Sequence, residues 1–329
     1  MSFVNLTDFA TLDVPCLASD GREVVLVVVK GTFRITDEGP VLAGEQAPVR
    51  TVDEVYDPEA EQSSVRLPGD VVLTKPGADV VVVGSARSAV PVTSMMVGVA
   101  LSDRAVQLRI WGERLFYRGA GGRLVVGEAT AFTEKPVTYE RARGGTSADY
   151  AVVERRNPVG RGVAASDEEL VDTLAPQIED PALPVTAASD RHPPVGFGAI
   201  AMHWSPRCEY MGTLDARWEQ ERMPLMPLDF DPRHFLCAHP SLQLSRPLVA
   251  GEAIRVEGMR VAGPLAFEIP PMPLSITGCF DDGERAEQQP GLDTLVIDAD
   301  AETFEVTCRA AFPLGRGKRR LRAVRVAQA

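Results

Sequence analysis

The sequence is poor in the residues that hydrolases and nucleotide-binding enzymes depend on. Its 329 residues include only four histidines, and no serine lies in the Gly-x-Ser-x-Gly pattern of a nucleophile elbow. Gly196-Phe197-Gly198 imitates a dinucleotide-binding loop, but it follows two prolines instead of a strand. Residues 315–318 lack the spacing and the Ser or Thr of a phosphate-binding loop. We therefore expect no cofactor and no enzymatic activity.

Long apolar runs and paired cysteines are also missing. Residues 24–29 and 80–83 are apolar runs of strand length, whereas a membrane-spanning helix needs about 18 apolar residues or more. Residues 1–16 lack the basic segment and the apolar stretch of a signal peptide. The five cysteines are odd in number and widely scattered, which is typical of reduced thiols. These features predict a cytoplasmic protein without a membrane span.

Basic residues are outnumbered by acidic ones. The chain has 34 Lys and Arg against 46 Asp and Glu, a formal net charge of −12, which argues against a nucleic-acid partner. The exception is the segment 316–329, where six basic residues occur without an acid. Such a segment can contact a nucleic acid, an anionic lipid or the acidic face of the protein itself. The simplest expectation is a solvated basic tail.

What is present instead is a pattern of short apolar runs separated by turn residues. Valine-rich runs favour strands, and the 28 glycines and 26 prolines favour turns over long helices. The runs gather in residues 1–138 and 245–315, which predicts a mainly β protein with two strand-rich lobes, sandwich-like or partly closed. The expected strands are 23–35, 41–42, 70–74, 79–85, 92–101, 105–112, 115–118, 123–126, 252–256, 265–269, 274–280, 294–299 and 304–312.

Between the lobes, residues 139–244 form a long segment rich in proline and glycine. Its motifs specify turns, rigid backbone and large anchors rather than a periodic helix or strand. A few short helices are expected, one after the capping box formed by Ser166 and Glu169 and one over residues 215–221. Because a long irregular segment inside a compact chain is typically functional, we interpret it as an ordered interaction surface.

Eight residues of this motif-rich segment are candidates for partner binding or for bracing its loops. An arginine among Gly and Pro can tie carbonyls and carboxylates together through its fork of donors. We favour bracing for the arginines, and core packing over exposed contact for the tryptophans. The candidates are Arg141, Arg143, Asn157, Arg161, Trp204, Arg207, Asp215 and Trp218.

Charged residues also occur in or beside the predicted core strands. Lys30 interrupts one apolar run, and Asp70, Lys75 and Asp79 flank the next. Because an isolated buried charge is costly, we expect these charges to be paired and to fix the arrangement of the strands.

Soft and borderline metal ligands gather between residues 203 and 239. Cys237 and His239 could supply two ligands of a tetrahedral zinc site, but the spacings match no common zinc module. Buried cysteines with capping histidines are the ordinary alternative, so we expect no metal. The residues concerned are His203, Cys208, His234, Cys237 and His239.

Carboxylates in the same segment leave one enzymatic alternative open. Glu179, Asp180, Asp215, Asp229 and Asp231 could include the acid–base pair of a hydrolase. Carboxylates in loops near arginines are more often structural partners. A hydrolase is therefore the alternative hypothesis.

Read in order, the motifs resemble a bacterial family, domain of unknown function 2169, which is found beside type VI secretion genes. No single motif carries the resemblance; the ordered set does, over about residues 20–312. Cys308-Arg309 departs from the Trp-Arg expected there. The matching stretches are 30–33, 70–79, 84–86, 139–145, 157–162, 178–181, 194–198, 204–207, 212–215, 218 and 293–295.

The resemblance implies an accessory role in secretion. A member would act as a non-catalytic adaptor or chaperone that binds a secreted effector toxin and helps load it onto the spike. Its partners would be that toxin and the spike or spike-tip protein. Besides the hydrolase, a structural component of a contractile injection particle remains an alternative.

Overall fold

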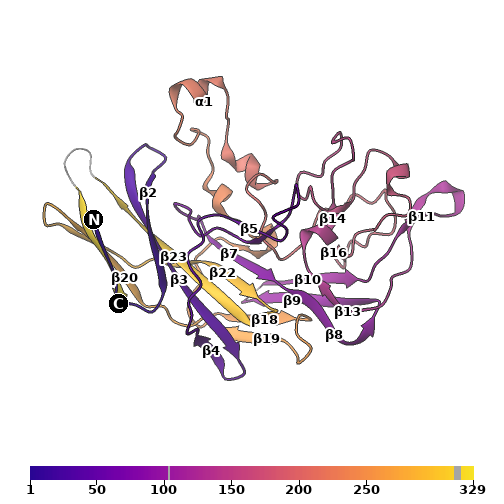
Figure 1. The fold of residues 1–329 in the computed structure, drawn as a ribbon, viewed down its shortest axis with the longest axis horizontal. Helices are drawn as coiled ribbons and strands as arrows, with labels where there is room; N and C mark the ends of the chain where they lie inside the picture. The colour runs from indigo at the N-terminus through magenta and orange to yellow at the C-terminus, as the bar shows by residue number, and fades with distance from the viewer. Residues whose placement is uncertain (103, 315–319) are drawn as a thin grey trace.

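The computed structural model describes residues 1–102, 104–314 and 320–329, and these fold mainly into β-strands arranged in several sheets (Figure 1). The one α-helix is short, and the other helical elements of the described residues are single 3₁₀ turns. No helix among them is long and apolar enough to cross a membrane. The mainly β fold class with few short helices is therefore confirmed.

The largest sheet has seven strands and contains most of the valine-rich runs. Its strands follow the order β17-β7-β22-β23-β3-β2, and β4 pairs with β3 beside β2. In β3 the residues from Val24 to Val29 are all buried, because this strand lies in the interior of the sheet and both of its faces are covered. The bounds are β2 Ala10–Leu17, β3 Glu23–Thr36, β4 Gly39–Leu42, β7 Ala78–Val83, β17 Gln243–Leu244, β22 Leu292–Asp298 and β23 Thr303–Pro313.

Strands from the two ends of the chain share this sheet. β7 pairs in parallel with β22, and β3 pairs antiparallel with β23 along eleven residues of β23. A five-stranded sheet mixes the two ends in the same way, in the order β16-β10-β9-β18-β19. The two expected strand-rich segments therefore do not form separate sheets. The bounds are β9 Ser94–Leu101, β10 Arg104–Trp111, β16 Ile178–Glu179, β18 Ala253–Glu257 and β19 Leu265–Glu268.

A four-stranded sheet contains the C-terminal segment. β24 (Leu321–Gln328) lies between β1 (Ser2–Asn5) and β20 (Leu274–Phe280), with β21 (Arg285–Gln288) at the far edge. The expectation of a solvated tail is therefore wrong for β24. Leu321, Val324 and Val326 of this strand are buried, while Arg322 and Arg325 are exposed. Arg316, Lys318 and Arg319, three of the six basic residues in the predicted tail, lie outside the described residues.

Most of the other expected strands are present, and one is not. The strands expected at 92–101 and 105–112 pair as the hairpin of β9 and β10, with Ser102 at a positive φ in the turn, while residue 103 lies outside the described residues. Residues 70–74 are irregular, so the strand predicted there is wrong. Short pairs complete the fold: β5 (Glu54–Val55) with β6 (Val65–Leu67), β8 (Ser85–Val92) with β13 (Phe132–Pro136), and β11 (Phe116–Arg118) with β12 (Leu124–Val126).

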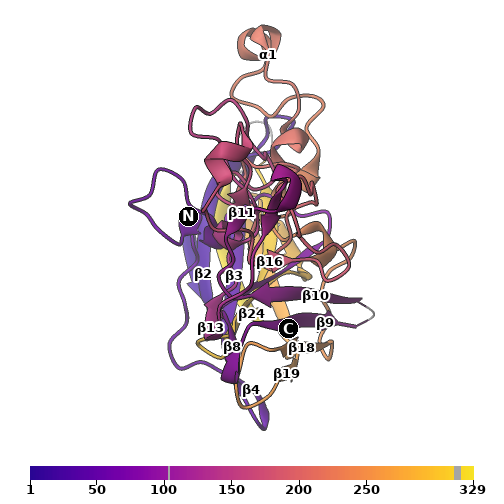
Figure 2. The same ribbon diagram turned by 90° about the vertical axis from the view of Figure 1, so that its right-hand side faces the viewer.

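The motif-rich segment 139–244 is mostly irregular. The helix predicted over residues 215–221 is confirmed as α1 (Ala216–Glu221). The predicted capping box at Ser166 is wrong, because the helix is a single 3₁₀ turn, Asp167–Leu170, and the Ser166 side chain makes no capping bond. Figures 1 and 2 both show α1 at the end of an arm that stands clear of the sheets. The remaining 3₁₀ turns of the segment are Tyr139–Arg141, Arg207–Met211, Pro232–Phe235 and Pro240–Leu242.

Candidate partner-binding site

Arg143 and Asn157 tie together the first part of the motif-rich segment. Arg143 is buried, and its guanidinium donates to the carbonyl oxygens of Asp190 (2.9 Å) and His192 (3.0 Å). Asn157 is also buried, and its Nδ2 donates to the carbonyl oxygens of Tyr139 (2.8 Å) and Arg143 (3.0 Å). Since these bonds satisfy backbone groups that the irregular loops leave unpaired, both side chains act as braces.

Glycines allow these braced loops to approach one another closely. Strand β14 (Arg143–Gly144) pairs in parallel with β15 (Arg161–Gly162). A Cβ atom on Gly144 would lie 2.2 Å from the carbonyl oxygen of Asn157, and one on Gly160 would lie 2.4 Å from the Asn157 Nδ2. No side chain fits at such distances, so the Gly-rich motifs of the sequence mark a packing requirement.

Trp204 and Arg207 anchor the middle of the segment. Trp204 is buried, with its ring edge-on to Tyr139 at a centroid distance of 5.8 Å. Arg207 is buried, and its guanidinium donates to the carbonyl oxygens of His234 (3.0 Å) and Ile200 (2.5 Å). Both residues therefore lie in the interior and do not offer a surface to a partner.

The arm that carries α1 is held in a defined shape by its polar residues. Asp215 is the N-cap of α1 and accepts a hydrogen bond from the Trp218 backbone (2.8 Å). The half-buried Trp218 donates its indole N–H to the Leu225 carbonyl oxygen (2.8 Å). Asp229 accepts bonds from the backbone and the hydroxyl of Thr213 and so closes the base of the arm.

Two contacts fasten the arm to the body. Arg222 donates to the carbonyl oxygen of Ser19 (2.8 Å) in the turn between β2 and β3. The Leu225 side chain lies against Gly21 of the same turn. The arm is therefore anchored beside its tip as well as at its base, which limits its freedom before any partner arrives.

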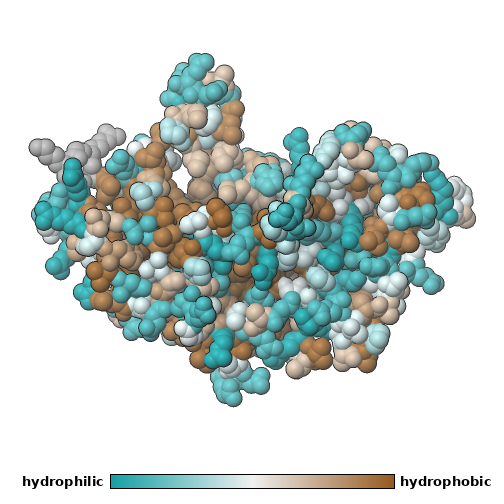
Figure 3. Space-filling view, viewed as in Figure 1, coloured by the Kyte–Doolittle hydropathy of each residue, from teal (hydrophilic) through white to brown (hydrophobic). Residues whose placement is uncertain are grey.

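Large apolar side chains on this arm face solvent. Leu228 is 85% exposed, Met223 60% and Leu214 55%. Figure 3 shows apolar surface along the side of the protruding arm. Single exposed apolar residues are common on protein surfaces, but several on one protruding element are typical of a binding surface. We call Leu214, Met223 and Leu228 the apolar face of the arm.

Arg141 and Arg161 differ from the bracing arginines. Among the described residues, the Arg141 guanidinium donates only to the hydroxyl of Thr138, at 3.3 Å. The Nη1 atom of Arg161 is buried without a hydrogen-bond partner among the described residues. Sequence reasoning grouped these two arginines with Arg143 and Arg207, because all four stand in similar surroundings of Gly and Pro.

The possible metal ligands are dispersed and already bonded to other groups. His234 Nδ1 lies 2.8 Å from the Arg207 carbonyl oxygen, and His239 Nδ1 lies 2.7 Å from the Ser241 hydroxyl. His203 is exposed, and the Cys208 sulfur lies 3.7 Å from the Ser205 hydroxyl. Within residues 1–102, 104–314 and 320–329, no group of three or more His, Cys, Asp or Glu side chains is arranged to hold a metal ion.

Cys237 belongs instead to a buried polar contact with the largest sheet. Its sulfur lies 3.5 Å from Asp79 Oδ2, and its backbone N–H donates to the same oxygen at 3.0 Å. Burial, reinforced by the Asp79 charge, raises the pKa of the Cys237 thiol to about 12. The thiol is therefore protonated at neutral pH and is not a nucleophile.

The loop carboxylates accept hydrogen bonds from their own surroundings. Glu179 accepts from the Trp111 indole (2.5 Å), and Asp180 accepts from the backbone of Ala182 (2.8 Å). Hydrogen bonds from the Thr213 backbone and hydroxyl lower the pKa of Asp229, and the Arg233 guanidinium lowers that of Asp231. A general acid needs a raised pKa, so neither of these two aspartates is tuned for that role.

The expected pairing of charges near the core strands is confirmed. Lys30 Nζ lies 2.8 Å from Asp70, and Lys75 Nζ lies 2.5 Å from Asp79, with all four side chains buried. Two further members of the Lys30 cluster were not found by sequence reasoning. Arg50 contacts Glu305 at 2.5 Å, and Glu305 lies 3.6 Å from Lys30. They are distant in sequence from Lys30 and Asp70, so no local pattern identifies them.

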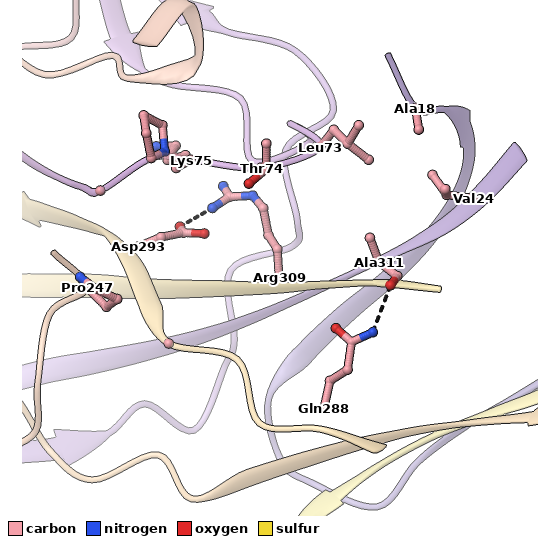
Figure 4. A pocket seen from close by; sticks show the side chains of 13 residues that line it. Ala18, Val24, Leu73, Thr74, Lys75, Pro247, Gln288, Asp293, Arg309 and Ala311 are labelled. Carbon is pink, nitrogen blue, oxygen red and sulfur yellow. Dashed lines mark hydrogen bonds and ion pairs between the residues drawn. The ribbon is translucent and has the colours of Figure 1, made fainter. Parts of the chain in front are cut away.

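Sequence reasoning also missed a groove beside β23. An open cavity of about 500 Å³ lies there, lined by residues that include Lys75, Asp293, Arg309 and Ala311 (Figure 4). β22 pairs with β23 only as far as Cys308, so the last residues of β23 lack a strand neighbour on that side among the described residues.

Polar side chains partly satisfy this open edge of β23. The amide of Gln288 donates to the Ala311 carbonyl oxygen at 2.7 Å (Figure 4). Arg309 contacts Asp293 and donates to the Asp70 carbonyl oxygen at 2.9 Å, but its Nη2 atom is buried without a partner in the described part of the chain. The groove thus combines an open strand edge with an unused donor, which suits an extended peptide segment.

The chain was compared with protein-family models, with curated proteins and with solved structures. The model of a family described as "Uncharacterized protein conserved in bacteria (DUF2169)" matches residues 20–309. No curated protein matches the chain, and no solved structure matches it. The family match spans most of the sequence and includes the whole motif-rich segment, in agreement with the resemblance drawn from the motifs. The chain therefore belongs to the DUF2169 family of bacterial proteins.

Proposed function

We propose that this chain is a non-catalytic adaptor that binds a secreted effector toxin of a type VI secretion system and stabilises it or helps load it onto the spike. The single observation that carries the binding role is the apolar face of the arm. Leu228, Met223 and Leu214 are each more than half exposed on an element that projects from the body. The link to secretion rests on the family resemblance described above.

The arm is well suited to bind a partner because it is already ordered. Asp215, Trp218 and Asp229 fix its internal shape, and Arg222 fastens it to the body. Rigid presentation lowers the conformational entropy that association would otherwise cost. An apolar helix or groove of the toxin that covers Leu228 and Met223 would remove their side chains from water, which favours binding by about 25 cal/mol per Å² of apolar surface.

The groove beside β23 offers a second kind of contact. An extended segment of the toxin could pair with the open edge of β23 after displacing the Gln288 amide from Ala311. Backbone pairing of this kind depends little on the sequence of the toxin segment. The apolar face of the arm, in contrast, selects a toxin surface that is apolar and complementary in shape. An adaptor that uses both surfaces can hold a folded domain and a flexible segment of the same partner.

The test is affinity purification of the chain from its native cells, with the bound proteins identified by mass spectrometry. We expect one toxin-like protein, in near-equal amount, with the wild-type chain. Met223→Ser combined with Leu228→Ser should reduce its recovery about tenfold or more, because the centre of the apolar face is removed.

A matched control is Val90→Ser, which changes a similarly exposed apolar residue (62%) on β8. Full recovery with this variant and loss with the arm variant would support the arm as the binding surface. Equal recovery with both variants would exclude the arm. A wild-type chain that brings down no partner, while the secretion genes are expressed, would contradict the adaptor role.

A further inference from the structure

Three cations in and near the motif-rich segment stand without the ion pairs that most buried cations of this protein form. Lys135, on β13, is only 9% exposed, and its ammonium group lies over the ring of Phe132, 5.5 Å from the ring centroid. Arg141 has one long bond to a hydroxyl, and Arg161 has a buried Nη1 with no partner. None of the three forms an ion pair within residues 1–102, 104–314 and 320–329.

The backbone brings these cations together. The Arg161 backbone N–H donates to the Ala142 carbonyl oxygen at 2.9 Å, which places β15 directly beside the chain at Arg141. Burial lowers the pKa of Lys135, and the charges of Arg141 and Arg161 lower it further, against an opposing effect of Glu113. Burial and the charge of Arg141 also lower the pKa of Arg161. The three charges therefore lie close enough to repel one another.

An unpaired donor next to them is also buried. Gln177 is 1% exposed, its backbone N–H donates to the Arg141 carbonyl oxygen at 2.8 Å, and its side-chain Nε2 has no hydrogen-bond partner in the described part of the chain. Buried donors normally have acceptors, so the unpaired donors of Gln177 and Arg161, both beside residues 141 and 142, indicate a missing acceptor.

The nearby carboxylates do not supply that acceptor. Glu140 accepts bonds from the backbone and the hydroxyl of Ser64, both at 2.8 Å, and forms no ion pair with a cation among the described residues. Glu113 is exposed and lies within 4 Å of no cation among the described residues. Neither carboxylate therefore forms an ion pair with the three cations among the described residues, although both act on the pKa of Arg161 from a greater distance.

The site is open to solvent at Arg161. This residue lines an open cavity of about 490 Å³ together with Thr146, Gly162, Thr173 and one acid, Glu169. The hydroxyls of Thr146 and Thr173 are turned toward backbone carbonyl oxygens. Of the three cations, Arg161 borders this cavity, so a small ligand would approach the group from the side of Arg161.

We infer that Lys135, Arg141 and Arg161 form an oxyanion-binding site that takes a phosphate or a carboxylate group. Guanidinium groups bind the oxygens of both groups with directed hydrogen bonds, and an ammonium group adds a compact charge. A bound oxyanion would relieve the repulsion among the three cations and accept bonds from Arg161 and Gln177. This inference goes beyond the adaptor proposal and does not depend on it, since the site lies on other residues than the apolar face of the arm.

The test measures thermal unfolding of the full chain in sodium chloride, sodium phosphate and sodium acetate at constant ionic strength and pH. The variants are Arg161→Gln and, as a matched control, Arg217→Gln, whose side chain is 80% exposed and paired with Glu221 on α1. We expect an oxyanion to raise the wild-type melting temperature by about 2 °C or more over chloride. Arg161→Gln should lose at least half of that rise, whereas Arg217→Gln should keep it.

A second variant separates a binding site from a structural role. Lys135→Met removes a buried cation that lacks an ion-pair partner, so it should raise the melting temperature in chloride and reduce the response to the oxyanion. A purely structural lysine would instead lower stability when replaced. A larger response to phosphate than to acetate would assign the site to a phosphate-bearing ligand, and the reverse would assign it to a carboxylate, such as an acidic side chain of a partner.

Two results would overturn the inference. One is a wild-type chain that phosphate and acetate stabilise no more than chloride does. The other is an equal response in Arg161→Gln and Arg217→Gln, because salts of these anions stabilise folded proteins generally and such an effect is the same in every variant. If Lys135→Met fails to fold, the comparison of the two arginine variants still decides.

Discussion

Lys30 in the largest sheet and Lys135 near the motif-rich segment are both buried lysines, but their surroundings differ. Lys30 lies 2.8 Å from Asp70, within a cluster that also contains Arg50 and Glu305. Lys135 has an aromatic ring beside it and two arginines in electrostatic range, with no ion pair among the described residues. The comparison teaches that charge in this protein is balanced inside the sheet and left open in the neighbouring loops. We expect the first arrangement to stabilise the fold and the second to leave positive charge available to a ligand.

The largest effect is expected from a substitution in the Lys30 cluster, where the buried charges are paired. Asp70→Ala removes the closest partner of Lys30 and an acceptor of the Arg50 backbone N–H. Because it leaves a buried charge poorly compensated, the free energy of unfolding should fall by about 3–5 kcal/mol. Denaturant unfolding measures the change.

The control for that experiment is Asp20→Ala, whose side chain pairs with Arg22 at 2.6 Å but is about half exposed. The stability of this variant should be indistinguishable from that of the wild-type chain. Equal losses in the two variants would show that burial of the pair does not decide its contribution.

A smaller effect is expected in the braced loops. Gly144→Ala places a Cβ atom 2.2 Å from the Asn157 carbonyl oxygen, so β14 and the loop at Asn157, which leads into β15, must move apart. Overpacking of this kind should lower the free energy of unfolding by about 1–3 kcal/mol. The change would also weaken the oxyanion response, since Arg161 lies on β15.

Its control is Gly44→Ala, which meets no atom within 4 Å and should be nearly neutral. Denaturant unfolding and the phosphate response should be recorded for both variants. An undiminished phosphate response in a destabilised Gly144→Ala variant would mean that the position of β15 does not set the anion site.

The smallest effect is a change of stability with pH, which tests the paired charges of the largest sheet. Burial alone would raise the pKa of Asp79, but the Lys75 charge and hydrogen bonds from Lys75, Cys237 and Ala238 outweigh it and hold that pKa below its usual range. A carboxyl group with a depressed pKa stabilises the fold above its unfolded pKa of about 3.9 and loses that contribution as pH falls through the folded value.

Stability should therefore fall as the pH drops below about 4, with Asp79 contributing up to about 1.4 kcal/mol per pH unit. Urea unfolding between pH 7 and pH 3 measures the slope. Asp79→Asn should start from a lower stability and lose less of it in acid. A slope identical to that of the wild-type chain would show that Asp79 does not titrate in this range.

Much of the fold follows from local pattern. Valine runs such as residues 24–29 form strands because β-branched side chains suit a pleated, buried surface. The arginines of β24 predict a solvated tail, but its leucine and valine residues, which follow a period of two only from Val324 to Val326, are buried in the sheet. Residues 70–74 show the reverse case, because a strand is expected there and the structure is irregular. Their apolar residues predict a strand, but the segment is an irregular loop from which Asp70 accepts a hydrogen bond from Lys30.

The candidate site could be predicted only in part. The motif-rich segment and its arginines were visible as a series of Gly, Pro and Arg, and so was the helix capped by Asp215. The apolar face of the arm was not, because exposure depends on which neighbours cover a side chain. The groove beside β23 was not visible either, since it arises where β22 stops short of the end of β23.

By itself, the sequence determined the mainly β character, the positions of most strands, the irregular nature of residues 139–244 and the membership of the family, because each depends on residue type and local spacing. Only the tertiary structure decided which charges are paired. Arg143 and Arg161 occupy neighbouring strands in similar surroundings, yet the first donates to the carbonyl oxygens of Asp190 and His192, while the buried Nη1 of the second meets no acceptor among the described residues. That difference depends on loops distant in sequence, whose approach is set by packing and not by any local signal.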